Sequence, residues 1–114
     1  MRDDHLDHEA LAELKEVMEE DFHILLSTYL SDSQVRIDGL KQALNNNDPE
    51  QYARAAHSLK GSCINIGAMR LGNLCMSAER AGRAGELHSA PTNLAAIESE
   101  FELVSEQLES YLAT

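Results

Sequence analysis

The chain has 114 residues, of which 9 are Lys or Arg and 20 are Asp or Glu, so its formal net charge at pH 7 is −11. This length accommodates one core and is too short for two domains, and the negative charge argues against nucleic acid and against an anionic membrane surface as partners. Apolar residues make up 43% of the chain and aromatic residues only 4%. Together with the abundance of Ala, Leu and Glu, this composition favours helices over sheet.

The cysteines and the N-terminus indicate where such a protein works. Cys63 and Cys75 are too few for a disulfide framework or a zinc site, which indicates a reduced, intracellular protein. No apolar region of a signal peptide follows the acidic N-terminus, and no apolar run approaches the roughly 20 residues of a membrane helix. We therefore expect a cytoplasmic protein, folded as a single domain over residues 1–114 with an N-terminal tail at 1–6.

Capping residues divide the chain into five predicted helices. Asp7 suits the N-cap of a short first helix, where Leu6 and Leu11 are placed to form a hydrophobic staple. The acidic residues 19–21 open a long second helix, because negative charge is favourable at a helix N-terminus. Apolar residues recur every three or four positions along this helix, and three consecutive Asn at 45–47 end it.

The remaining helices are delimited in the same way. Asp48 caps a third helix that begins at Pro49 and ends before Gly67. A fourth helix is predicted for about 68–85, and Pro91 opens the last one, which carries one continuous apolar seam. Four long helices with short connections predict an all-α fold, an antiparallel four-helix bundle with the short first helix covering one end.

The third predicted helix carries a histidine on the face opposite to its core. At 100° per residue, the buried stripe is centred on Leu59, whereas His57 lies roughly 160° away. We therefore expect His57 to face solvent. Three more residues share this face and a fourth borders it: Arg54, Gly61, Ile64 and Lys60.

Gly61 explains how a partner reaches that histidine. Glycine inside a helix costs about 1 kcal/mol relative to Ala, so its presence needs a reason. Helical side chains lean toward the N-terminus, and the residue four positions after His57 therefore shades the ring. A glycine there leaves the imidazole open. With Ile64 exposed and positive charge from Arg54 and Lys60, this face is predicted to be approached by another large molecule.

Glu79 on the fourth predicted helix lies at a level similar to His57. The two helices meet at Gly67, with His57 10 residues before it and Glu79 12 residues after it. A carboxylate there can accept a hydrogen bond from one ring nitrogen and leave the other as a nucleophile. A surface pair with Arg83, four residues later, fits the spacing equally well. Met76 lies on the same row of the helix.

The residues around His57 resemble the signature of histidine-containing phosphotransfer (HPt) domains. That signature reads His-x-Leu-Lys-Gly-Ser, then Gly-Ala and Leu, on neighbouring helices of a four-helix bundle. The matching residues are His57-Ser58-Leu59-Lys60-Gly61-Ser62-Cys63, Gly67-Ala68, Leu71 and Cys75. One small departure is Cys63, which stands where Ser or Ala is common. The helix count, order and length extend the resemblance over the whole chain.

This resemblance implies a role for each matching residue. His57 corresponds to the phosphorylated histidine, Lys60 to the lysine that neutralises the phosphoryl group, and Gly61 to the glycine that keeps the ring accessible. Glu79 falls where a Gln or Glu often orients the ring, and Arg83 where a basic residue often flanks the site. We also expect four residues to contact partners: Arg54, Ile64, Met76 and Arg83.

The resemblance further implies a stand-alone phosphoryl carrier with no ATP-binding or autokinase activity of its own. Such a carrier takes the phosphoryl group from a receiver-domain aspartate of a hybrid histidine kinase and passes it to the aspartate of a response regulator. The reaction runs through a loose, in-line transition state that needs mainly an exposed nucleophile and nearby positive charge. We expect a monomer with no cofactor or metal of its own, any Mg²⁺ being held by the receiver.

Other functions fit the sequence less well. A di-iron bundle needs Glu-x-x-His twice, and here only residues 20–23 provide it. A histidine kinase is excluded because the chain has no room for an ATP-binding domain. The run Lys60-Gly61-Ser62 also lacks the preceding glycines and the residue order of a P-loop. A cysteine hydrolase is disfavoured because both cysteines are predicted to be buried. The alternative that remains is a helical adaptor that docks on receiver domains without accepting phosphate.

The negative charge is unevenly distributed along the chain. Residues 54–83 contain five basic residues and one acidic residue, a balance of +4, and the remainder has four basic and 19 acidic residues, a balance of −15. The acidity therefore belongs to the scaffold, and the predicted hairpin around His57 is basic. Such a patch suits the carboxylate-lined pocket of receiver domains, and the acidic remainder discourages misdirected docking.

Overall fold

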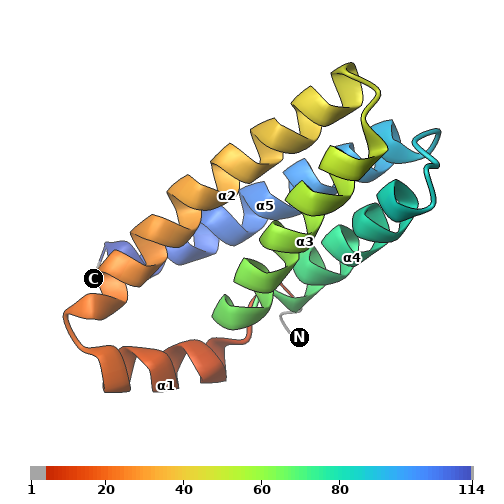
Figure 1. Cartoon of the computed structure of the whole chain (residues 1–114). Coiled ribbons are helices and arrows are strands. Elements are labelled where there is room, and N and C mark those ends of the chain that lie inside the picture. Colours follow the sequence, from red (N-terminus) through yellow and green to blue (C-terminus); the bar gives the residue numbers. More distant parts are fainter. Residues whose placement is uncertain (1–4, 114) are drawn as a thin grey trace.

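The computed structural model describes residues 5–113, and these form an antiparallel bundle with a short helix at one end (Figure 1). The helices are α1 (His8–Met18), α2 (Asp21–Asn45), α3 (Pro49–Ile66), α4 (Met69–Arg83) and α5 (Ala90–Leu112). Each long helix packs on two others, in the cyclic order α2, α3, α4, α5. The predicted all-α fold, with four long helices and a short N-terminal one, is confirmed.

The predicted caps account for where the helices begin and end. Asp7 Oδ1 accepts a hydrogen bond from the Ala10 N–H at 3.0 Å and so starts α1. Asp48 Oδ1 does the same for the Gln51 N–H at 3.1 Å at the start of α3. Gly67 ends α3 in the left-handed conformation, with φ 84°, which glycine adopts without a steric penalty.

Some boundaries differ from the sequence-based prediction. α4 spans Met69–Arg83, shorter than 68–85, because Gly85 adopts a positive φ of 72° in the turn that follows the helix. Leu6, assigned to the tail 1–6, is 3% exposed and packs in the core. The Asp7 N–H donates to the Gly67 carbonyl at 3.0 Å, which ties this segment to the α3–α4 turn. Residues 1–4 of the expected tail lie outside the described residues.

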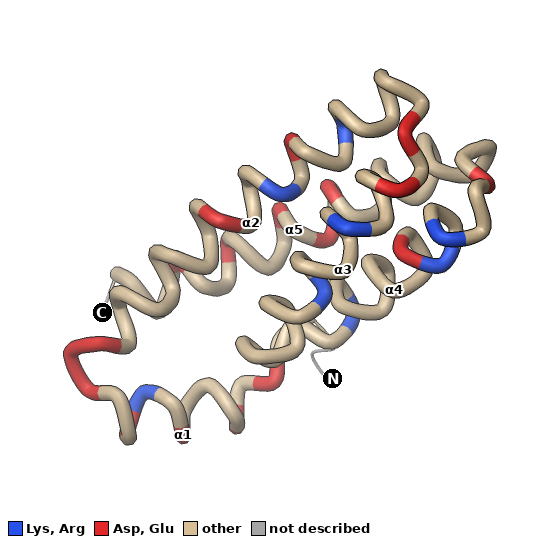
Figure 2. Tube along the Cα trace, in the orientation of Figure 1, with Lys and Arg blue, Asp and Glu red and all other residues tan. Residues whose placement is uncertain are grey.

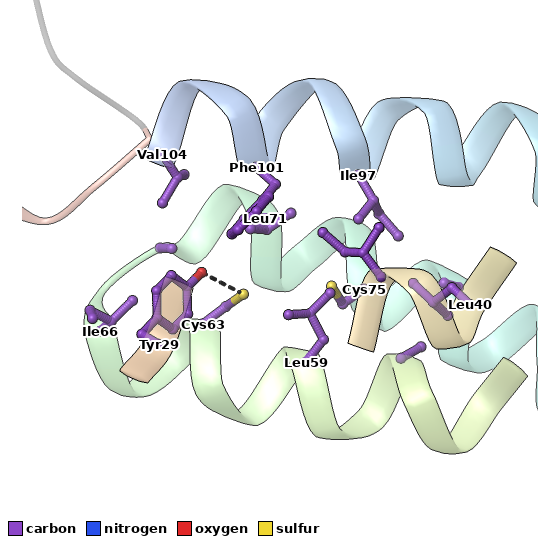
Figure 3. Close-up of a cluster of buried hydrophobic side chains, with 14 of the residues drawn as sticks. Tyr29, Leu40, Leu59, Cys63, Ile66, Leu71, Cys75, Ile97, Phe101 and Val104 are labelled. Carbon is purple, nitrogen blue, oxygen red and sulfur yellow. Dashed lines mark hydrogen bonds between the residues drawn. The ribbon is translucent and has the colours of Figure 1, made fainter. Parts of the chain in front are cut away.

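The core between the helices contains both cysteines (Figure 3). Cys63 from α3 and Cys75 from α4 are buried free thiols, as predicted. The Tyr29 hydroxyl and the Cys63 Sγ form a hydrogen bond of 3.2 Å, and burial raises the pKa of Tyr29. These three side chains therefore belong to the packed interior.

The buried surface of α4 is wider than a single stripe. Gly72 and Glu79 are buried as well as Leu71, Cys75 and Ala78, whereas Leu74 is only partly buried. The reason is that α4 packs on α3 on one side and on α5 on the other. A prediction from helical periodicity assumes a single buried stripe, and so it does not include the side of α4 that packs on α5.

Gly82 lies where the end of α4 packs tightly against the start of α3. A Cβ atom at this position would lie 2.7 Å from the Pro49 carbonyl oxygen and 2.8 Å from the Ala53 Cβ, closer than van der Waals contact allows. Gly61 is the opposite case, because a Cβ there would meet nothing within 4 Å. One glycine brings the two helices together, and the other leaves a surface open.

The two glycines predict opposite effects of the same substitution. Gly82→Ala should destabilise the fold by about 1–3 kcal/mol, because the methyl group overpacks the contact with α3. Gly61→Ala should stabilise it by about 0.5–1 kcal/mol through helix propensity alone. Urea unfolding of both variants measures the difference, and equal shifts in the same direction would contradict this account of the α3–α4 contact.

Candidate functional site

His57 lies near the middle of α3, with its side chain 60% exposed. It is not a core histidine, because the same helix buries Ala56 and Leu59 on its other side. Its ring is nevertheless attached to the bundle on one edge. The Nδ1 atom lies 3.0 Å from the Glu79 Oε2 of α4, while the structure gives the Nε2 atom no hydrogen-bond partner among the described residues.

Glu79 is the centre of the polar contacts between α3 and α4. Its side chain is only 8% exposed, so its charge requires partners. The Lys60 Nζ donates to Oε1 at 2.6 Å. The Arg83 Nε and Nη2 both donate to Oε2, at 3.0 Å and 2.7 Å. One carboxylate thus holds the histidine ring and two cations.

These partners fix the protonation state of the site. The hydrogen bond from Lys60 is the main cause that lowers the pKa of Glu79 to about 2, aided by Arg83 and His57 and opposed by burial. Glu79 is therefore a carboxylate at neutral pH and only accepts hydrogen bonds. It follows that the His57 Nδ1 donates the hydrogen bond to Glu79, so that in the neutral ring the free lone pair lies on Nε2.

The two interpretations of Glu79 that the sequence left open hold at the same time. Glu79 contacts the His57 ring and also pairs with Arg83 four residues later. The contact that the sequence did not reveal is the one with Lys60, whose side chain turns toward α4 and is 21% exposed. The signal for it was the matched level of the two helices, which brings position 60 as well as position 57 next to position 79.

The expected partner-contacting residues lie in different surroundings. Arg54 is exposed and pairs with Glu50 on its own helix. Ile64 is an exposed apolar residue that lies over Gly72, and Met76 is partly buried. Arg83 is 65% exposed and is directed at Glu79. Arg54 and Arg83 also line one depression of about 630 Å³, between the start of α3 and the end of α4.

A second depression, of about 150 Å³, lies between α2 and α3, and the sequence gave no sign of it. It brings together residues far apart in the chain: Leu25, Thr28, Tyr29, Asp32, Ser62, Asn65 and Ile66. Its α3 residues, Ser62, Asn65 and Ile66, lie on the flank of that helix that packs against α2. Only the packing of α2 on α3 creates it.

The charges follow the distribution that the sequence indicated. Lys and Arg recur along α3 and α4, and many of the acidic residues lie on α1, α2, α5 and the loops (Figure 2). None of the helices described over residues 5–113 is long and apolar enough to cross a membrane. In the same part of the chain, no three His, Cys, Asp or Glu side chains gather as a metal site would require.

A helical bundle that presents a histidine outward, with one ring nitrogen held by a carboxylate and cations beside it, belongs to the class of phosphotransfer bundles. Residues 24–110 match the family model described as Hpt domain. The chain is therefore a member of the Hpt domain family. The match begins within α2, so α1 lies outside it.

Solved structures agree with this assignment. The fold is similar to that of histidine-containing phosphotransfer protein B (HptB) from Pseudomonas aeruginosa PAO1, with 38% sequence identity and a TM-score of 0.91 over 94% of this chain and 93% of that one. A putative histidine-containing phosphotransfer protein from rice shares the fold at 18% identity and a TM-score of 0.84, over 96% of this chain and 82% of that one. A comparison with curated proteins gave no match.

The lowered pKa of Glu79 predicts a particular loss of stability in acid. A carboxyl group with a lower pKa in the folded state stabilises the fold above its ordinary pKa, near 4.5, and this contribution is lost as the pH falls through about 2. The difference in unfolding free energy between wild type and Glu79→Gln should therefore shrink by about 1 kcal/mol from pH 6 to pH 3. This figure is reduced because solvent screens the ion pair between Glu79 and the exposed Arg83. Urea unfolding at both pH values measures it, and a difference independent of pH would contradict the charge assignment.

Proposed function

We propose that this protein is a phosphorelay carrier whose His57 accepts a phosphoryl group from a receiver-domain aspartate and delivers it to another. The receivers would be those of a hybrid histidine kinase and of a response regulator. The observation that carries the proposal is the state of the ring: Nδ1 donates to a buried carboxylate and Nε2 is free on an exposed face. An exposed nucleophile beside positive charge is what phosphoryl transfer requires of an acceptor.

In the proposed step, the Nε2 lone pair attacks the phosphorus of the aspartyl phosphate. The new P–N bond forms as the P–O bond to the receiver breaks, and the electron pair leaves with the aspartate carboxylate. The proton stays on Nδ1, so the ring becomes positively charged next to Glu79. Glu79 therefore stabilises the charge that develops on the ring, and the reverse step to a second receiver uses the same contact.

Lys60 supplies positive charge for the incoming phosphoryl group, and Gly61 leaves the space through which it arrives. We propose that the protein acts as a monomer, without ATP-binding or autokinase activity. Any Mg²⁺ required would be held by the receiver. Ile64 is exposed about two turns beyond His57 on the same face of α3, which supports a partner large enough to cover both residues.

His57→Gln should abolish phosphoryl uptake. Purified wild type and variant are mixed with a panel of receiver domains carrying radiolabelled phosphate, and transfer of the label is followed over time. Wild type should gain label that is lost in acid and is stable in base, as expected for a phosphoramidate. The fold should be unaffected, because the side chain is exposed, and circular dichroism checks this.

The same experiment separates the carrier from a docking adaptor. An adaptor binds the receivers but gains no label, and it tolerates His57→Gln without loss of binding. Equal labelling of wild type and variant would contradict the assignment of His57 as the phosphorylated residue. So would label that is stable in acid, as a phosphoserine is.

Gly61→Leu tests the explanation for the glycine. The added side chain fits without a clash at its Cβ and leans over the ring four residues earlier. We expect transfer to slow by about tenfold or more, about 1.4 kcal/mol in activation free energy, while the helix content stays the same. Gly61→Ala is the matched control and should have a much smaller effect. Unchanged transfer by Gly61→Leu would show that access is not the reason for the glycine.

A further inference from the structure

Two cations compensate a single carboxylate at this site. Lys60 and Arg83 both pair with Glu79. The three side chains therefore carry a net charge of +1, one positive charge more than is required to neutralise the carboxylate. The two cations are held differently. Lys60 reaches across from α3 through a flexible stem to Oε1, whereas Arg83 donates two hydrogen bonds to Oε2 from the next turn of α4.

The phosphorylated state needs this extra charge. A phosphoryl group brings close to two negative charges, and the ring of His57 gains one positive charge when Nε2 is phosphorylated. Lys60 adds the second, and Arg83 then balances Glu79. With both cations the site sums to about zero, and without Arg83 it carries an uncompensated negative charge.

We infer that Arg83 is a positioning residue: it holds Glu79 in place and compensated when Lys60 turns from that carboxylate to the phosphoryl group. This inference rests on the proposed phosphotransfer function. This role differs from the partner-contacting role expected for Arg83, because Arg83 would act on the reaction by holding Glu79 and not by contacting the receiver. The guanidinium suits the task, since it stays charged and binds with fixed geometry, and a lysine suits the movable role.

Transfer kinetics distinguish the two roles of Arg83. The rate of phosphoryl uptake is measured against the concentration of a phosphorylated receiver for wild type, Arg83→Gln and Arg80→Gln. Arg80 is the matched control, because it is an exposed arginine of the same helix with no ion pair to the described residues, and its loss changes the net charge equally. Arg83→Gln should lower the saturating rate about tenfold relative to Arg80→Gln, at the same half-saturating concentration.

A second background removes the need for Arg83. In Glu79→Gln no carboxylate has to be compensated, so adding Arg83→Gln should change the saturating rate less than twofold. A residue that contacts the receiver would instead have the same effect in both backgrounds. Arg83→Lys should recover only part of the rate, because it keeps the charge but not the pair of hydrogen bonds that holds Glu79.

Phosphorylation by a small donor removes docking altogether. With phosphoramidate, which transfers its phosphoryl group as ammonia leaves, Arg83→Gln should still be labelled about tenfold more slowly than Arg80→Gln. A raised half-saturating concentration at an unchanged saturating rate would overturn the inference, as would equal kinetics of the two arginine variants. Failure of wild type to gain label from any donor would instead reject the proposed function.

Discussion

A carboxylate buried between two helices determines how this site is organised. Glu79 is held away from water, so its charge must be met by hydrogen bonds from neighbouring groups. Lys60 and Arg83 provide them from two helices, and His57 Nδ1 takes the remaining place. Because the cations keep Glu79 ionised, the tautomer of the histidine follows. The free lone pair on Nε2 of the neutral ring is thus a consequence of a buried charge on the adjacent helix.

The close packing of α3 against α4 makes this contact possible. Gly67 reverses the chain in a conformation that favours glycine, and Gly82 lets the helices meet at their far end without a side chain between them. Between these two points, His57 and Glu79 are brought to the same level. Gly61 differs from both, because it serves neither the turn nor the packing and leaves the ring open to solvent. Three glycines therefore shape one site in three ways.

The charges outside the site complement those within it. The hairpin of α3 and α4 carries a surplus of positive charge on a strongly acidic chain. Fields of this kind steer partners of opposite charge and repel others. Together with the exposed apolar Ile64, they favour an acidic partner that covers the open face of His57, in keeping with the proposed receiver domains.

Local signals in the sequence were sufficient for the helices, their caps at Asp7, Asp48 and Gly67, and the outward face of His57. Each of these depends on residues within one or two turns of each other. The burial of Glu79, its hydrogen bond to Lys60 and the depression between α2 and α3 required the folded bundle. They arise where α4 packs on α3 and α5, and where α2 packs on α3, contacts between segments that no local periodicity relates. The partners of Glu79 show the difference most clearly. The pair with Arg83 could be predicted from their spacing of four residues, whereas the contact with Lys60 depends on how α3 packs on α4.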